Sequence, residues 1–487
     1  MPADPNPLLV ALLILVVIMV FNLIIFVHEL GHFWAAKWRG LKIDRFQIWF
    51  GKPIWSKTIK GVQYGLGWIP AGGFVALPQM APMGAIEGQN SEGEEPLPPI
   101  SPLDKIIVAF AGPLFSFLLA LTAALVIYVI KKPIDIIHTT TVGWVQHDSP
   151  ADKAGFQRND KIIAINGQPV ENWNMPLNSV YMHIVTSKGD QIQFTVDRPG
   201  VGEMNIVSEF EIPESKWWQR KKTREVGLIP IRPEGPVQIT GFSEDENAPA
   251  KLAGFEVGDV FLEVDGVAVT QYEQVTEAIQ LSEGKTLNIS ILRDGKEMEI
   301  PVAPARMIPE TPDPKAKDQP FMLGAMFDVP DFYVREWIKP TPFEQISETV
   351  QSMWITITTV ASPQSSIGIQ HLSGPVGIGK IQYYSLLMDN PFHRILAFMV
   401  LININLAILN MLPFPVLDGG HITIATMEAI ARRPVNVKFL EVIQIGFVFI
   451  LFSIMIYVTS KDVVDDFGMG GGDDSPTRYV FPKPAAE

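Results

Sequence analysis

The sequence predicts a polytopic α-helical membrane protein with four transmembrane helices and two small α/β domains between the second and third helices. Two observations predict this class: four long uncharged apolar runs and an internal repeat in the hydrophilic middle segment. Charged residues make up only 18% of the 487 residues. The apolar excess must therefore lie somewhere other than a water-facing surface.

Each apolar run is close to the roughly 20 residues that a helix needs to cross a hydrocarbon core. The runs are Leu8–Val27, Ile106–Ile130, Ile395–Leu417 and Val442–Ser460. A cleaved signal peptide is the alternative for the first run, but no basic residue precedes it and no small-residue cleavage pattern follows it. We expect membrane segments within residues 1–40, 105–132, 393–420 and 440–460.

Basic residues predict the orientation of these segments. They follow the first run at Lys37, Arg39, Lys42 and Arg45, and they separate the third and fourth runs at Arg432, Arg433 and Lys438. By the positive-inside rule, residues 41–104 and 421–439 are cytoplasmic, although Lys131 and Lys132 oppose this weakly. The middle segment then lies outside the cytoplasm, and in a chain without cysteine this fits a bacterial periplasm.

The middle segment contains one pattern twice, at an offset of 99 residues. The first copy reads SPADKAGFQRNDKIIAINGQPV from Ser149, and the second reads APAKLAGFEVGDVFLEVDGVAV from Ala248. Each copy predicts a short helix, a glycine stop, and a strand that ends in an Asn-Gly or Asp-Gly turn.

This pattern resembles bacterial PDZ domains, although Asn159 departs from the glycine that Gly258 keeps in the second copy. The resemblance implies two PDZ-like domains, over residues 133–232 and 233–306. Such domains bind an extended peptide as an added strand. The alternative is a steric gate that has no peptide ligand.

The pentapeptide His28-Glu29-Leu30-Gly31-His32 directly continues the first apolar run. The two histidines are four residues apart, so on a helix they share a face and can hold one ion. Glu29 adjoins the first, where its carboxylate can act as general base on a water molecule at the metal. A coincidental helix surface is the alternative, but ionisable residues near lipid are costly and indicate a functional site.

Catalytic zinc usually has three protein ligands, and Asp418 is the best candidate for the third. It ends the stretch NMLPFPVLD, which starts at Asn410, and it directly follows the third apolar run, where two prolines and two glycines break the helix. Irregular backbone at membrane depth is tolerated only where it lines protein or water. The first and third spans run in the same direction, so both reach the same side of the bilayer. A turn or cap role is the alternative for Asp418, and His421 is a lower-ranked ligand.

Three asparagines lie in the third run, at positions 403, 405 and 410. An amide there could stabilise the oxyanion of a tetrahedral intermediate or bind the substrate backbone. The alternative is hydrogen bonding between helices. The residues alone do not choose between the three.

Together, HExxH in the first span and NxxPxPxLDG in the third resemble the site-2 protease family of intramembrane zinc metalloproteases. Four spans with two PDZ-like copies resemble its bacterial branch. The resemblance implies that His28, His32 and Asp418 bind Zn²⁺, that Glu29 is the catalytic base, and that Asn410 contacts the substrate. It implies an inner-membrane protein with periplasmic PDZ-like domains and an active site near the cytoplasmic side. The implied substrates are transmembrane segments of single-span proteins, such as an anti-sigma factor already cut in the periplasm, and remnant signal peptides.

Two further segments resemble family features. Residues 64–77 resemble the membrane-associated β-loop, and we expect the edge at Gly72, Gly73 and Phe74 to bind an unwound substrate strand. An amphipathic hairpin at the membrane surface is the alternative. Residues 111–117 resemble the family's AGPxxNF motif, with Ser116 in place of the usual asparagine.

The remaining segments predict accessory structure. We expect an amphipathic helix in the linker 307–392 and a flexible tail over residues 461–487. A non-enzymatic PDZ scaffold and a transporter are the rival classes, but a scaffold needs no ion and the halves show no inverted hydropathy repeat. The net charge of −14, without a basic stripe, argues against nucleic-acid binding.

Overall fold

The computed structural model describes residues 6–80, 100–215, 219–310, 319–433, 435, 437–467 and 479–482. Its helices are α1 Pro7–Trp38, α2 Pro102–Ile130, α3 Pro150–Lys153, α4 Val180–Val185, α5 Pro249–Ala253, α6 Tyr272–Leu281, α7 Pro342–Val360, α8 Pro375–Leu387, α9 Pro391–Asn410, α10 Asp418–Ala431 and α11 Val437–Phe467. Its strands are β1 Arg45–Ile59, β2 Val62–Ala76, β3 Lys132–Ile136, β4 Val142–Val145, β5 Lys161–Ile165, β6 Gln168–Pro169, β7 Ile192–Arg198, β8 Gly202–Ser208, β9 Leu228–Pro230, β10 Val237–Phe242, β11 Val260–Val264, β12 Val267–Ala268, β13 Leu287–Arg293, β14 Lys296–Val302, β15 Ala305–Arg306, β16 Ile308–Pro309, β17 Phe321–Met322, β18 Ala325–Asp328, β19 Val334–Ile338 and β20 Tyr479–Val480.

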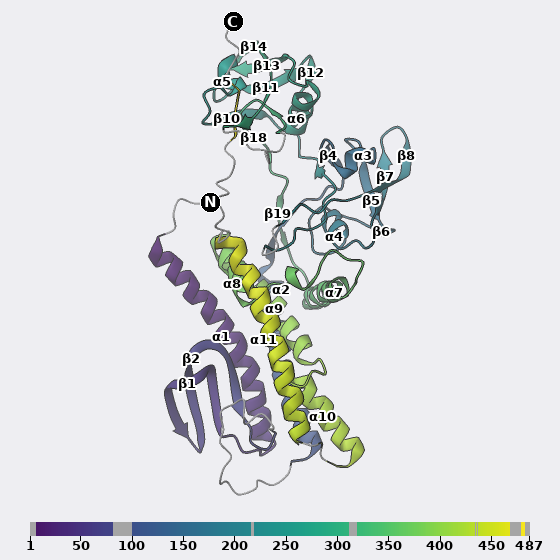
Figure 1. Ribbon diagram of the computed structural model, residues 1–487. Coiled ribbons are helices and arrows are strands. Elements are labelled where there is room, and N and C mark those ends of the chain that lie inside the picture. The colour runs from purple at the N-terminus through teal and green to yellow at the C-terminus, as the bar shows by residue number, and fades with distance from the viewer. Residues whose placement is uncertain are drawn as a thin grey trace.

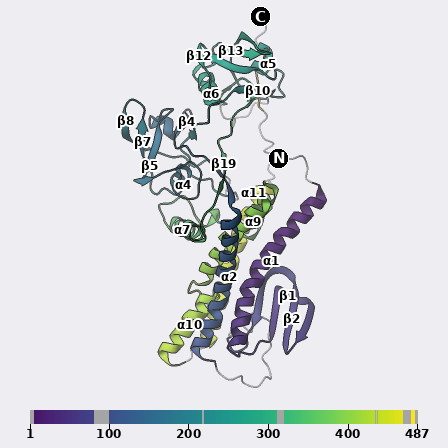
Figure 2. The same cartoon turned by 180° about the vertical axis from the view of Figure 1, so that it is seen from behind.

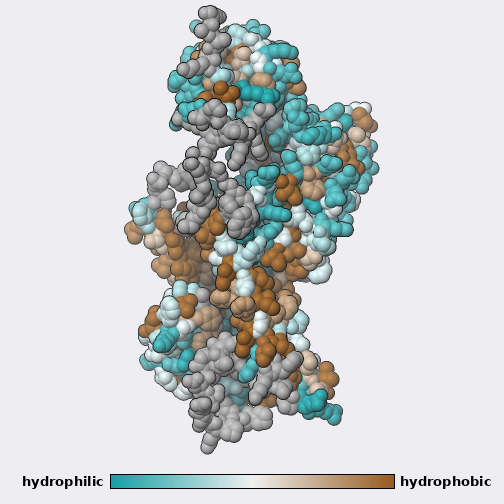
Figure 3. Space-filling model, in the orientation of Figure 1, coloured by the Kyte–Doolittle hydropathy of each residue, from teal (hydrophilic) through white to brown (hydrophobic). Residues whose placement is uncertain are grey.

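Four of the described helices are long and apolar enough to cross a membrane, as the sequence predicts. They are α1, α2, α9 and the part of α11 from Leu440 to Val464. They lie side by side, with the two repeat units beyond one end and the β1–β2 hairpin beside α1 near the other (Figure 1). The same arrangement is visible from behind (Figure 2). Hydrophobic residues gather over the helical bundle, and hydrophilic residues gather over the repeat units (Figure 3).

Small residues bring α2 and α9 close together. Ala120 and Ala124 of α2 are wholly buried and pack against Val400 and Ile404 of α9. Since lipid is as apolar as the helices, close backbone approach through small side chains is the usual basis of helix association in membranes. These contacts fix α9, and with it the segment that follows its C-terminal end.

α9 ends at Asn410, before Pro413 and Pro415, so the break expected ahead of Asp418 is present. One helix boundary differs from the expected one. α11 continues to Phe467, although residues from 461 onward were expected to form a flexible tail. Residues 468–478 and 483–487 of that tail lie outside the described residues.

The two repeat copies fold in the same way. Each has a short helix that ends at a glycine with positive φ, Gly155 at +84° and Gly254 at +86°. The first unit has a four-stranded sheet in the order β6-β5-β7-β8, and the second has the order β14-β13-β11-β10-β18 with β12 beside β11. The helix, glycine and strand predicted for each copy are therefore confirmed.

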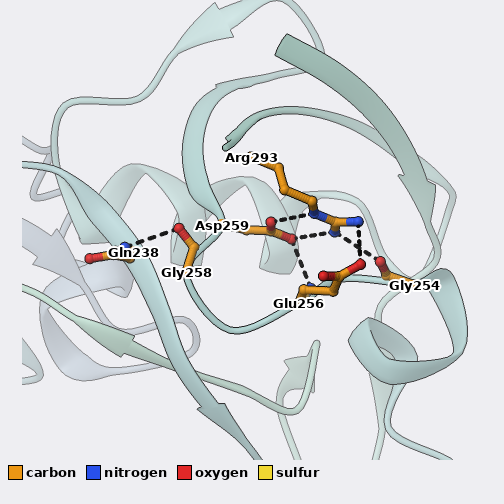
Figure 4. Close-up of polar contacts among 6 residues, drawn as sticks. All are labelled: Gln238, Gly254, Glu256, Gly258, Asp259 and Arg293. Atoms are coloured by element: carbon orange, nitrogen blue, oxygen red, sulfur yellow. Dashed lines mark hydrogen bonds and ion pairs between the residues drawn. The ribbon is translucent and has the colours of Figure 1, made fainter. Parts of the chain in front are cut away.

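A matching ion pair closes each unit. In the second unit, Arg293 donates to both carboxylate oxygens of the buried Asp259, at 2.7 and 2.6 Å, and to the carbonyl of Gly254 at 2.9 Å (Figure 4). In the first unit, Arg198 binds Asp160 in the same way, at 2.7 and 2.8 Å. The aspartate that both copies share is therefore the buried anchor of an arginine.

The second unit is longer than expected. Its predicted end is residue 306, but β18 pairs with β10 and Leu323 lies in its core. Beyond it, β19 pairs with β3, which directly follows α2, and leads into α7. The β3–β19 pair therefore connects the repeat units to the helical bundle.

The linker helix α7 has its polar face against the protein. Gln345 and Thr349 are buried, and Gln345 donates to the carbonyl of Ala124 in α2 at 3.0 Å. On the opposite side, Phe343 and Trp354 are exposed. α7 is therefore amphipathic, as predicted, but its polar face packs on the protein and its apolar face is exposed. This apolar face suits a lipid surface.

Candidate metal centre and active-site pocket

The β1–β2 hairpin places a sheet edge beside the HExxH end of α1. Residues 45–48 pair with 63–66 on one side and with 73–76 on the other, so the start of β1 lies between the two halves of β2. The strand 73–76 has no further partner on its outer side in the described structure. A Cβ placed on Gly73 would lie 3.1 Å from Ile25 and 3.3 Å from Glu29, which shows how closely this edge approaches α1.

Asp418 reaches the site because the segment 411–417 folds tightly over the start of α10. A Cβ on Gly419 would lie 2.3 Å from the carbonyl of Met411, and a Cβ on Gly420 would lie 2.0 Å from that of Phe414. Gln444 of α11 donates to the carbonyl of Pro415 at 3.0 Å. Both glycines after Asp418 are therefore required by packing, and they let the carboxylate start a new helix at the end of the third span.

Three side chains converge at this point. Nε2 of His28 lies 3.3 Å from Oδ2 of Asp418, and Nε2 of His32 lies 3.4 Å from Oδ1. The two Nε2 atoms are 3.3 Å apart. Within the described part of the chain, these three residues form the one group of histidines and acids close enough to share a metal ion.

The outer nitrogens of both imidazoles are already engaged. Nδ1 of His32 lies 2.8 Å from the carbonyl oxygen of Val108, which can only accept, so Nδ1 carries the proton. Nδ1 of His28 lies 3.0 Å from Oγ of the buried Ser116. With its proton on Nδ1, His32 has the lone pair of Nε2 free for a metal ion, and the contact with Ser116 holds the ring of His28 beside it.

The donor set fits Zn²⁺ by three tests. Donor separations of 3.3–3.4 Å match the edge of a tetrahedron with bonds of about 2.0–2.1 Å. Oδ2 of Asp418 is buried without a hydrogen-bond donor among the described residues. Gly112 of α2 leaves the space open, since a Cβ there would lie 2.2 Å from Nε2 of His32.

A cavity of about 430 Å³ opens beside this cluster. Glu29 lines it, and so does Val75 on the free sheet edge. Every site residue predicted from the sequence lies in this lining: His28, Glu29, His32, Gly72, Gly73, Phe74, Asn410 and Asp418. The pocket therefore unites a metal cluster, a carboxylate and a sheet edge.

The structure also separates the residues that sequence left open. Asn410 lines the pocket, whereas Asn403 is fully buried and donates to the carbonyl of Met399 in its own helix. Asn405 is not among the lining residues. His421 lines the pocket but lies outside the three-residue cluster.

Several residues at the site were not recognised from the sequence. Gly112 makes room for the imidazoles, and Phe50 faces the pocket from the opposite strand. Ser116 was noted only as a departure from an asparagine, but its hydroxyl holds His28. A visible signal existed for Asn22, which is the one amide in the first apolar run and binds Trp49 of the hairpin.

Comparison with known proteins gives a consistent result. A model of Peptidase family M50 matches residues 16–454. A Vibrio cholerae protein named "Putative zinc metalloprotease" is 30% identical over 467 residues, which cover 91% of this chain and 97% of the relative. The chain is also similar to "Regulator of sigma E protease" of Haemophilus influenzae and "Regulator of sigma-E protease RseP" of Escherichia coli. Each is 28% identical, with 86% of this chain and 91% of the relative covered.

Proposed function

The chain belongs to peptidase family M50, the site-2 protease family of zinc metalloproteases, and from this premise we propose that it cleaves peptide bonds inside transmembrane segments of single-span proteins. One observation carries the proposal: the metal cluster, Glu29 and a free sheet edge share one pocket beside two candidate membrane spans.

In the proposed site, His28, His32 and Asp418 hold Zn²⁺. When bound, the ion supplies a Lewis acid and lowers the pKa of a bound water toward about 7. Glu29 takes the proton of the attacking water and delivers it to the leaving amine. Asn410, on the α9 side of the same pocket, donates its amide to the carbonyl oxygen of the scissile bond as negative charge develops there.

The sheet edge solves a problem specific to membrane substrates. A transmembrane helix hides its amides in internal hydrogen bonds, so it has to unwind before water can attack. In lipid, each freed backbone group needs a new partner. The strand 73–76 offers such partners beside Glu29, and an extended substrate can pair with it as an added strand. Gly72, Gly73 and Phe74 would then contact the substrate.

We further propose that the two repeat units are PDZ-like domains in the periplasm. Their shared helix, glycine and antiparallel strands support this, and so do the basic residues at the other end of the bundle. A second cavity of about 420 Å³ lies between α6 and β17–β18 and reaches Trp144 of the first unit. The cavity suits an extended peptide, and the alternative is that the two domains act as a gate that excludes bulky outer domains. The metal cluster favours an enzyme over a non-enzymatic scaffold.

The substrate proposed from the relatives named for sigma-E regulation is a single-span anti-sigma factor, with remnant signal peptides as a second class. The test compares wild type with Glu29→Gln, purified with zinc and mixed with a model single-span substrate. The variant should bind one zinc ion per chain and show no cleavage, because only the general base is lost. Cleavage by the variant at the wild-type rate would refute the role of Glu29.

A further inference from the structure

A polar contact inside the membrane region joins α1 to the hairpin. Asn22 is the one hydrogen-bonding side chain in the run Leu8–Val27. Its Nδ2 donates to the carbonyl of Ile18 in the same helix at 2.7 Å, and its Oδ1 accepts the indole N–H of Trp49. Because hydrocarbon offers no water as a substitute partner, each group depends on the other.

Trp49 lies in a distortion of β1. Its φ is +66°, a conformation that non-glycine residues rarely adopt, and the register of β1 against β2 shifts between Ile48 and Pro53. The wholly buried Gln47 holds the backbone there, since its Nε2 donates to the carbonyls of Trp49 and Gly51 at 2.9 and 2.8 Å. The side chains of Gln47 and Asn22 therefore both hold this bulge in place.

The bulge places an aromatic pair at the pocket. Phe50, the next residue, stacks on Phe74 with ring centroids 6.4 Å apart and planes at 6°. Its ring crosses Gly72, where a Cβ would lie 1.9 Å away. Phe50, Gly72 and Phe74 all line the cavity beside Glu29. The position of the bulge thus sets the position of the sheet edge.

Asn22, which binds the hairpin, and Glu29, the proposed catalytic base, lie on one face of α1. Asn22, Ile25 and Glu29 are spaced i, i+3 and i+7, so they lie on the same helix face. Ile25 and Glu29 are the α1 residues that Gly73 approaches most closely. A shift of the hairpin at Asn22 is therefore transmitted directly to the edge at Glu29.

We propose that Asn22 and Trp49 form a clasp that positions the substrate-binding edge, residues 72–75, against the catalytic face of α1. The proposal rests on the proteolytic function proposed above. The two residues are positioning residues: they touch neither metal nor substrate, and they act through Phe50 and the edge strand. The clasp matters most for a substrate that has to unwind onto the edge, and least for one that is already extended.

The experiment uses the full-length, zinc-loaded protein and two model single-span substrates. One has a regular helix, and the other has a Gly-Pro break at the scissile bond. The variants are Asn22→Leu, Trp49→Phe and the double variant. The matched control is Thr122→Val on α2, which also removes a side-chain bond to its own helix carbonyl, that of Leu118. Zinc content and kcat and KM for both substrates are measured.

Each single variant should keep one zinc ion and lower kcat/KM for the helical substrate by about three- to tenfold, chiefly through KM. The double variant should be no worse than either single one, because both remove the same contact. Turnover of the broken substrate and of the control should change less than about twofold.

Three results would overturn the clasp: unchanged cleavage of the helical substrate by both singles, additive losses in the double variant, or loss of zinc in both singles. The proposed function fails separately. If wild type cleaves neither substrate, the protease assignment is wrong. If wild type cleaves, Glu29→Gln does not, and Asn22→Leu cleaves normally, only the clasp is wrong.

Discussion

At the scale of single residues, the metal centre depends on the space that Gly112 leaves by having no side chain. A Cβ on Gly112 would lie 2.2 Å from Nε2 of His32 and 2.9 Å from Nε2 of His28. Gly112→Ala should therefore lower zinc affinity by at least about tenfold, a loss comparable to the largest indirect effects at metal sites. Competition with a chelator measures this. Gly446→Ala on α11, where no atom lies within 4 Å of the new methyl group, is the control and should bind zinc normally.

Ser116 has the complementary role of holding a ligand in place. Its hydroxyl lies 3.0 Å from Nδ1 of His28, so it holds the ring in the orientation that places Nε2 at the metal cluster. Ser116→Ala should weaken zinc binding about tenfold without unfolding the chain. Ser453→Ala removes a hydroxyl that binds only its own helix carbonyl and should have no effect. Equal affinity in both variants would mean that the serine does not orient the histidine.

The residues that the sequence identified share a simple physical basis. Helical spacing alone places His28 and His32 on one face, and the structure brings their Nε2 atoms within 3.3 Å. Asp418 was found by elimination and by its position after a span. Gly112 and Val108 could not be found this way, because their roles depend on how α2 crosses α1 and on no local pattern. Asn22 was visible as an amide in an apolar run, but its partner was not.

At the scale of elements, the buried ion pair of each repeat unit carries the next prediction. Burial alone would raise the pKa of Asp259, but the bonds from Arg293 and from the backbone N–H of Glu256 outweigh it and hold this pKa below its usual value. Asp259→Asn removes the buried carboxylate and leaves Arg293 paired only with the exposed Glu256, at 2.8 Å, among the described acidic residues, which should destabilise the second unit by about 3 kcal/mol at pH 7.

The sign of the pH dependence follows from the lowered pKa. A carboxylate whose pKa is depressed by folding stabilises the folded state above its unfolded pKa of about 3.9, and this contribution is lost as pH falls through the folded value. The gap between wild type and Asp259→Asn should therefore be full at pH 7 and shrink below about pH 4. Amide hydrogen exchange of β11 and β13 measures it. Glu299→Gln, an exposed change on β14, is the control, and a pH-independent gap would contradict the ion-pair account.

Element boundaries were predicted least well where long-range pairing decides them. The second unit was expected to end at residue 306, because the hydrophilic, strand-like segment ends near Ala305. β18 joins its sheet only by pairing with β10, which comes about 90 residues earlier, and no local periodicity shows this. The end of α9 at Asn410 agrees with the helix break that Pro413 and Pro415 predict, because proline is a local signal.

At the scale of the whole molecule, charged groups connect the bundle to the soluble part. Asp462 near the end of α11 is buried and accepts hydrogen bonds from the backbone of Gly374 and Gly377, both at 2.9 Å. Arg220, between β8 and β9 of the first repeat unit, reaches the same carboxylate at 2.5 Å. The prediction of a flexible tail over residues 461–487 did not identify Asp462 as a buried contact, because its partners are far away in the chain.

Residues 479–482 pack against the second unit, and this contact gives the last prediction. β20 pairs with β16, with Val480 opposite Ile308. Phe481 is only 2% exposed, and its N–H donates to Asp245 at 2.6 Å. Because a buried phenylalanine cut back to alanine loses about 3 kcal/mol, Phe481→Ala should undock this segment most of the time.

The absence of cysteine makes that docking directly measurable. Cysteines placed at Ile308 and Val480 should join rapidly under a short thiol crosslinker in the otherwise unchanged protein, since paired residues on adjacent strands lie about 5 Å apart. Adding Phe481→Ala should slow the reaction by about two orders of magnitude, the factor that 3 kcal/mol represents. Adding Pro482→Ala, at an exposed position, should leave the rate unchanged. Equal rates with and without Phe481 would mean that β-pairing alone holds the segment, and that the end of the chain is tethered by its backbone and not by its buried ring.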